Sequence, residues 1–161
     1  MGLDAQQMLM QMRSFLFVCY GNICRSPALQ GCLEKKLEDI GIHALVESCG
    51  IAAQEGHPPD PHMKAIASQG GVTLKASSKR FHESDFERFD QIFCISNEIS
   101  EAVKALTPIE FQKEKVMLAT HFSTGRPIPD PYRLSKDGFL QVWGSIQLAC
   151  QGIIDHYYPL N

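Results

Sequence analysis

The sequence predicts an α/β fold, in which helices cover both faces of a parallel sheet. Three observations support this prediction. Short apolar runs alternate with helix-like segments along the chain, which is the order expected of parallel β-α-β units. Glycine and proline residues stand at most of the boundaries between these segments. With 161 residues, of which 44% are hydrophobic and 20% charged, the chain has the length and composition of one globular domain.

The elements follow one another in a regular order. The first strand is expected at Ser14–Cys19, where an apolar run ends in a cysteine. A helix is expected over residues 26–40, because apolar side chains recur there at spacings of three and four, and Gly41 is suited to end it. Further strands are expected over residues 43–48, 91–95 and 115–118, and further helices over residues 62–69, 97–106 and from 135 onward.

The segment after the first strand reads CYGNICRSP over residues 19–27 and has the composition of an anion-binding loop. Gly21 lets the backbone approach an anion closely, and Asn22 tolerates a left-handed conformation. The N–H groups of such a loop can turn inward around an oxyanion, and Arg25 can bind two of its oxygens through the planar guanidinium. The same positive surroundings favour the thiolate form of Cys19. The segment therefore predicts a site for a tetrahedral oxyanion with a nucleophilic sulfur beside it.

Residues 19–27 resemble the signature loop of the low molecular weight protein tyrosine phosphatases. Two later motifs match this family in order: VESCG at 46–50 resembles its second strand and serine-containing turn, and IPDPY at 128–132 resembles its late Asp-Pro-Tyr motif. The resemblance implies a flavodoxin-like, three-layer fold with four parallel strands. It covers most of the chain after the first dozen residues, so we expect a single phosphatase domain at 13–161 and a flexible extension at 1–12.

This resemblance implies hydrolysis of phosphotyrosine and other aryl phosphomonoesters through a phosphocysteine intermediate. Cys19 would then be the nucleophile, Arg25 would bind the phosphate, and Asp130 would protonate the leaving oxygen and later activate water. No metal or other cofactor is needed, because Arg25 and the backbone dipoles supply the positive field. The residues expected to contact phosphate or substrate are Tyr20, Gly21, Asn22, Ile23, Cys24, Ser26 and Tyr132, with Ser48 as a support for the loop.

Four departures from the family pattern bear on the site. Gln30 stands where the family often has Glu, which we expect to alter helix contacts rather than the chemistry. The loop at 52–56 lacks the usual Trp or Tyr, which predicts a weaker or shifted preference among protein substrates. Where many relatives have His and Arg before the Asp-Phe pair, residues 76–80 read ASSKR, so the network around the loop is expected to be rebuilt or weaker. Tyr20 replaces the common Leu or Thr and is expected to narrow the entrance or add stacking.

Three other functions remain open on the sequence. A protein-arginine phosphatase tends to carry Thr where this chain has Ile23, and the bulkier Ile favours the tyrosine enzyme. A thioredoxin-coupled arsenate reductase needs further cysteines near Cys94, and none follows within the next dozen residues. A non-catalytic phosphate-binding module needs neither a thiolate nor an acid, so Cys19 and Asp130 argue against it.

Charge and cysteine placement limit the partners and the compartment. A net charge of −3 argues against nucleic-acid binding, and no apolar run is long enough to span a membrane. The expected partner is a phosphorylated protein or a small aryl phosphate, with the chain as a monomer or weak dimer. Most of the six cysteines fall inside strand-like or helix-like runs, which is typical of buried thiols rather than of a disulfide framework. We therefore expect a reducing, cytoplasmic location.

Overall fold

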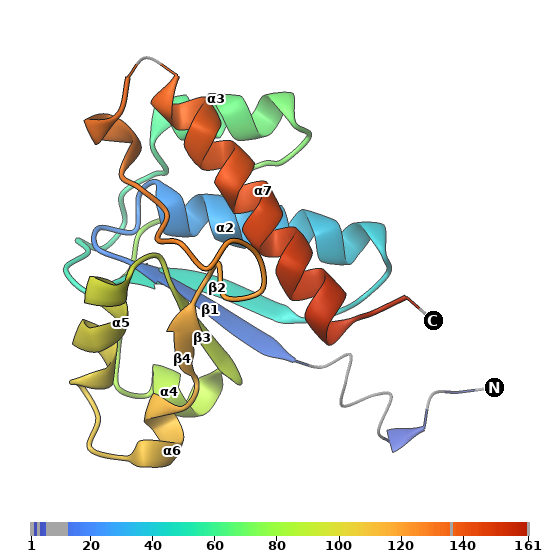
Figure 1. Ribbon diagram of the computed structural model, residues 1–161, viewed down its shortest axis with the longest axis vertical. Helices are drawn as coiled ribbons and strands as arrows, with labels where there is room; N and C mark the ends of the chain where they lie inside the picture. The colour runs from blue at the N-terminus through green and yellow to red at the C-terminus, as the bar shows by residue number, and fades with distance from the viewer. Residues whose placement is uncertain (1, 3, 6–12, 136, 161) are drawn as a thin grey trace.

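The computed structural model describes residues 2, 4–5, 13–135 and 137–160 (Figure 1). The expected extension at 1–12 lies almost entirely outside the described residues. No helix among the described residues is long and apolar enough to cross a membrane.

The sheet has four parallel strands in the order β2-β1-β3-β4. This arrangement confirms the predicted flavodoxin-like α/β fold. Because all strands are parallel, their carboxyl ends lie along one edge, where ligands of such sheets bind. The strands are β1 (Ser14–Cys19), β2 (Leu45–Gly50), β3 (Gln91–Cys94) and β4 (Val116–Leu118).

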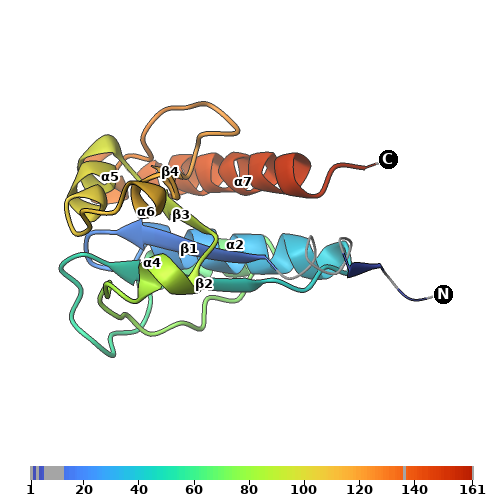
Figure 2. The same cartoon turned by 90° about the horizontal axis from the view of Figure 1, so that it is seen from below.

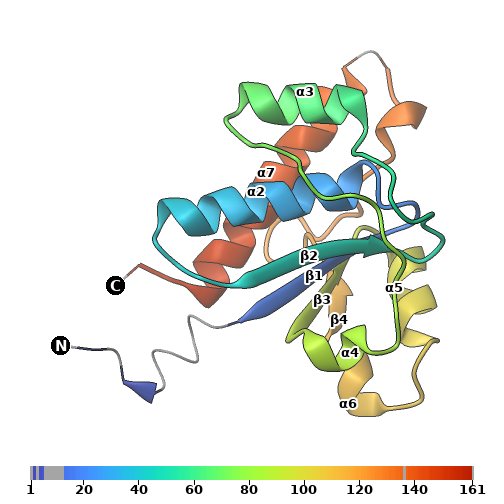
Figure 3. The same ribbon diagram turned by 180° about the vertical axis from the view of Figure 1, so that it is seen from behind.

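Helices form a layer on each side of the sheet. Figures 1 and 3 show α2, α3 and α7 on one side and α4, α5 and α6 on the other. The long helix α7 lies along α2 in the view of Figure 2. The bounds are α2 (Arg25–Asp39), α3 (Pro61–Gln69), α4 (Asp85–Arg88), α5 (Asn97–Lys104), α6 (Glu110–Lys113) and α7 (Gly138–Tyr157), with a 3₁₀ turn, η1, at Pro131–Arg133.

The core forms around β1, in which all six residues are buried. Phe93 on β3 stacks with two rings of β1, at centroid distances of 6.0 Å from Phe15 and 5.5 Å from Phe17. An apolar strand buried on both faces is what a central parallel strand requires, because helices cover each side. This packing fixes the position at which β1 ends, and therefore the position of Cys19.

One boundary and one helix differ from the sequence prediction, and the boundary matters for the site. The second strand runs to Gly50 rather than ending at residue 48, because Cys49 and Gly50 pair with the last two residues of β1. Helix α6 was not predicted, since it has no buried residue and hence no apolar periodicity.

Candidate active site

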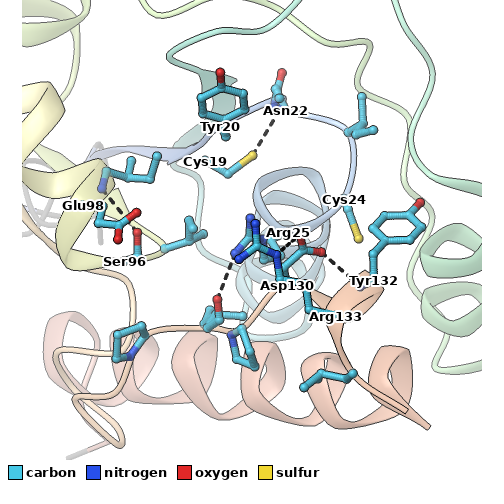
Figure 4. A pocket seen from close by; sticks show the side chains of 18 of the residues that line it. Cys19, Tyr20, Asn22, Cys24, Arg25, Ser96, Glu98, Asp130, Tyr132 and Arg133 are labelled. Atoms are coloured by element: carbon cyan, nitrogen blue, oxygen red, sulfur yellow. Dashed lines mark hydrogen bonds and ion pairs between the residues drawn. The ribbon is translucent and has the colours of Figure 1, made fainter. Parts of the chain in front are cut away.

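The loop between β1 and α2 curls back over the sulfur of Cys19. The backbone N–H of Asn22 donates to Cys19 Sγ at 3.1 Å (Figure 4). Ser26 Oγ lies 2.7 Å from the same sulfur. A backbone N–H and a serine hydroxyl therefore contact the sulfur that β1 carries to the carboxyl edge of the sheet. Hydrogen bonds to a sulfur from such donors stabilise its charged form.

Asn22 is the central support of this loop. It has a φ of 56°, which is the left-handed region that Asn tolerates better than most residues, and it is 2% exposed. Its side-chain amide donates to Ser26 Oγ at 2.9 Å and to Ser48 Oγ at 3.0 Å. Its carbonyl oxygen accepts the backbone N–H of Lys79 at 2.9 Å. Each polar group of this buried side chain thus has a partner.

These bonds limit what the two serine hydroxyls can donate to. Since Asn22 donates to both, each serine hydroxyl hydrogen is left for another acceptor. Ser48 donates to Gln30 Oε1 at 2.7 Å. Ser26 donates to the Cys49 carbonyl at 3.4 Å, and its Oγ lies 2.7 Å from the Cys19 sulfur. A thiol at Cys19 can donate to this oxygen, whereas a thiolate can only accept the Ser26 hydrogen.

Sequence reasoning missed the outer members of this network. The side chain of Gln30 accepts a hydrogen bond from Ser48, which binds the loop, and this contact was not foreseen. Gln30 lies four residues after Ser26 on α2, and that spacing was the available signal. Lys79 acts through its backbone N–H, for which no sequence signal exists. At 76–80 the contact with the loop is therefore made by the main chain.

Lys79 is itself held on both sides. Its carbonyl accepts the N–H of Gly50 at 3.0 Å, and its ammonium group pairs with Glu47 on β2. Glu47 also pairs with Arg88 at 2.7 Å. A side chain on Gly50 would place its Cβ 2.5 Å from the carbonyl oxygen of Tyr20, so only glycine permits this approach. The strand end, segment 76–80 and the Cys19 loop are therefore packed as one unit.

Arg25 and Asp130 line the same cavity, and Figure 4 shows their side chains beside each other. Arg25, the first residue of α2, donates from Nη1 to the carbonyl of Ile128 at 3.1 Å. Two residues later the chain reaches Asp130, whose Oδ1 accepts the N–H of Tyr132 at 3.0 Å. The Asp130 side chain is 35% exposed, and Arg133 Nε lies 3.9 Å from its Oδ2. The structure thus brings together the three residues that the sequence proposed for catalysis.

The cavity has a volume of about 860 Å³. It is bounded by the Cys19 loop, the start of α5 and the segment from Pro127 to Leu134 (Figure 4). Ser26 and Ser48 do not line it, since both lie beneath the loop and bind Asn22. The predicted residues that do line it are Cys19, Tyr20, Gly21, Asn22, Ile23, Cys24, Arg25, Asp130 and Tyr132.

The other cysteines differ from Cys19 in their surroundings. All six cysteines are free thiols. Burial raises the pKa of Cys24 to about 12, and the nearby Asp60 carboxylate acts in the same direction. Burial also raises the pKa of Cys94 to about 12. Among the described residues, no group of three or more His, Cys, Asp or Glu side chains is arranged to hold a metal ion.

Known proteins are similar to this chain in both sequence and fold. The sequence model of the family described as low molecular weight phosphotyrosine protein phosphatase matches residues 14–157. The low molecular weight protein-tyrosine-phosphatase of Streptomyces coelicolor is 32% identical, covering 86% of this chain and 89% of that protein. The protein-tyrosine-phosphatase Etp of Escherichia coli K12 is 34% identical, with 88% and 93% covered. A protein tyrosine phosphatase structure from Entamoeba histolytica superposes with a TM-score of 0.82 at 30% identity, covering 88% of this chain and 93% of that one.

These matches confirm the resemblance on which the sequence interpretation depended. They span the strands, the Cys19 loop and the Asp130 segment, because the match extends from the first residue of β1 to the last residue of α7. The chain therefore belongs to the low molecular weight phosphotyrosine protein phosphatase family.

Proposed function

We propose that this protein hydrolyses phosphotyrosine and other aryl phosphomonoesters through a phosphocysteine intermediate. The observation that supports this most directly is the Cys19 sulfur, which lies within hydrogen-bond reach of Asn22 N–H and Ser26 Oγ and faces a cavity shared with Arg25 and Asp130. A nucleophile, a cationic phosphate ligand and an acid around one cavity are the groups that phosphoryl transfer to a thiol requires.

In the first step, the Cys19 thiolate attacks phosphorus. A sulfur–phosphorus bond forms and the bond from phosphorus to the ring oxygen breaks. Asp130 gives its proton to the departing oxygen, which leaves as a neutral phenol. Arg25 and the loop N–H groups bind the equatorial oxygens while charge moves among them.

In the second step, water attacks the phosphocysteine. The Asp130 carboxylate takes a proton from this water, the sulfur–phosphorus bond breaks, and inorganic phosphate leaves. The Ser26 hydroxyl is placed to donate to the sulfur as its negative charge returns, because the two atoms are 2.7 Å apart. The Asn22 N–H also donates a hydrogen bond to this sulfur.

Two exposed tyrosines are proposed as walls for the substrate ring. Tyr20 follows the nucleophile and is 62% exposed, and Tyr132 follows Asp130 and is 57% exposed. Both line the cavity, and they belong to different segments. Rings of this kind favour an aromatic substrate through stacked or edge-to-face contacts. Tyr20 would compensate in part for the aromatic residue that the loop at 52–56 lacks.

Substitution at the nucleophile and at the acid tests this proposal. We expect Cys19→Ser to have no detectable turnover of aryl phosphates. Asp130→Asn should lose about 10²-fold or more in kcat for a phenol that is a poor leaving group, and much less for a good one. Equal losses for all leaving groups, or activity that does not depend on Cys19, would contradict the proposed roles.

A panel of phosphorylated peptides separates the alternatives. We expect hydrolysis of a phosphotyrosine peptide near neutral pH, with little or none for phosphoserine. A preference for phosphoarginine would instead indicate a protein-arginine phosphatase. Cys94 is fully buried, which disfavours the thiol relay that an arsenate reductase needs. Binding of every phosphopeptide without turnover would indicate a non-catalytic module.

The proposed cellular location is based on the free state of the cysteines. All six are free, which suits a reducing compartment such as the cytoplasm. Alkylation of the thiols at the moment of cell lysis should therefore find six reduced cysteines, and disulfides would contradict the assignment. The proposed partners are phosphorylated proteins or small aryl phosphates, with the chain a monomer or weak dimer, which sedimentation velocity tests.

A further inference from the structure

The cavity extends beyond the place that phosphate and ring would occupy. Its volume of about 860 Å³ is in the range of pockets that bury a drug-sized ligand. Phosphate would lie over the Cys19 loop, with the ring between Tyr20 and Tyr132. The start of α5 forms a further wall that neither group needs. This wall is available to the part of a protein substrate that flanks the phosphorylated residue.

The α5 wall has a fixed backbone and a charged side chain. Ser96 caps the helix, since its Oγ accepts the N–H of Ile99 at 3.3 Å. Asn97 and Glu98 form the exposed first turn, and both line the cavity. Figure 4 shows Glu98 beside Ser96 on the side of the cavity opposite Tyr132.

Glu98 is the one charged residue lining the cavity without a charged partner or a proposed task among the described residues. Arg25 is proposed to bind phosphate, and Arg133 lies 3.9 Å from the proposed acid, Asp130. Glu98 forms no salt bridge with any residue that the structure describes. A carboxylate that lines the same cavity as a phosphate dianion opposes the binding of small phosphate esters. A cation on the substrate would reverse this effect.

We propose that Glu98 forms a subsite for a lysine or arginine that lies close to the phosphotyrosine in a protein substrate. This inference rests on the proposed phosphotyrosine hydrolysis and adds a sequence preference to it. The substrate cation would pair with the carboxylate and offset its repulsion of the phosphate. Small aryl phosphates lack such a cation, so they would gain nothing from Glu98.

Matched peptides test this subsite. Phosphotyrosine peptides that differ only by Lys, Gln or Glu at one position are compared, with that position moved from two residues before to two residues after the phosphotyrosine. At low salt, the wild type should prefer Lys over Gln by about twofold to fivefold in kcat/KM at the best position, which is the range of an exposed ion pair. Glu98→Gln should remove this preference. Glu98→Lys should reverse it, so that the Glu peptide has the highest kcat/KM. High salt should weaken it in the wild type.

Glu101 provides the matched control. It lies on the same helix, three residues further on, it is 78% exposed, and it does not line the cavity. Glu101→Gln should therefore keep the preference of the wild type. The hydrolysis of phenyl phosphate is measured in parallel. Glu98→Gln should hydrolyse this substrate at the wild-type rate or faster.

Two results would overturn the subsite. One is equal kcat/KM for the Lys, Gln and Glu peptides in the wild type, and the other is a Lys preference that survives in Glu98→Gln. In both cases continued hydrolysis of phenyl phosphate would leave the proposed phosphatase function intact. A wild-type protein inactive on peptides and on phenyl phosphate would instead refute the proposed function, and the subsite with it.

Discussion

The two sides of the cavity are built in different ways. On the nucleophile side, Asn22 is 2% exposed and its side chain binds two serines and the Lys79 backbone. On the acid side, the Asp130 side chain is 35% exposed, and among the described residues its carboxylate accepts a hydrogen bond only from the N–H of Tyr132, two residues along the chain. The sulfur must meet phosphorus at one distance and angle in every substrate. The acid must reach leaving oxygens that differ among substrates, and a less constrained carboxylate suits that task.

The largest effect expected from this difference is in Asn22→Ala. The variant loses the support of both serines and places alanine in a left-handed conformation. We expect kcat/KM to fall on the order of 10²-fold, since a small displacement of a reacting atom costs this much. Measured over a series of aryl phosphates, the loss should be uniform, because it concerns the nucleophile. A loss that grows with the pKa of the leaving group would assign Asn22 to the acid side instead.

Gly50→Ala tests how tightly the nucleophile side is packed. The new Cβ would lie 2.5 Å from the Tyr20 carbonyl oxygen and 2.9 Å from Asn22 N. We expect the free energy of unfolding to fall by about 1–3 kcal/mol, as for other overpacked sites. Gly144→Ala is the control, because a Cβ there meets nothing within 4 Å and lies inside a helix. Urea unfolding of both variants measures these changes. Equal free energies of unfolding for the two variants would show that the loop has room to move.

Gln30→Leu removes the acceptor of the Ser48 hydroxyl without touching the loop itself. The loss of one such hydrogen bond is worth about 1 kcal/mol, so we expect kcat to fall about fivefold with little change in KM. Gln30→Glu retains an acceptor and should recover most of this loss. If both variants had the same rate as the wild type, the network would end at Ser48.

Arg133→Ala should have the smallest effect. The Arg133 side chain is 87% exposed and 3.9 Å from Asp130, and exposed pairs at such a distance contribute little. We expect kcat/KM for aryl phosphates within about twofold of the wild type. A tenfold loss in steady-state assays would show that the acid side is as constrained as the nucleophile side.

The fold and the inner site were predictable because their signals are local. An apolar run that ends in Cys19 marks a buried strand, and the residues from Gly21 to Ser26 follow within the next loop and the first residues of α2. Asp130 lies more than a hundred residues away, and only the Asp-Pro-Tyr motif and the family resemblance connected it with that loop. Local patterns therefore predicted Cys19 as the nucleophile, and the Asp-Pro-Tyr motif predicted Asp130 as the acid.

The parts that were not predicted depend on tertiary contacts. The Ser48–Gln30 bond joins β2 to α2, and the pairing of Glu47 with Lys79 and Arg88 joins β2 to two later segments. Such pairs have no spacing rule, because the chain between them can have any length. Helix α6 was missed for a different reason, since a short helix with no buried residue leaves no apolar pattern.

The bond from the Lys79 backbone to Asn22 has a consequence for how this protein tolerates mutation. A peptide N–H is present whatever side chain is attached, so codon changes at position 79 leave this donor in place unless they introduce proline, which has none. At position 79 the contact with Asn22 therefore excludes only proline, whereas the neighbouring Ser78 is 2% exposed and donates from its hydroxyl to the Gln54 carbonyl, so position 78 depends on its side chain.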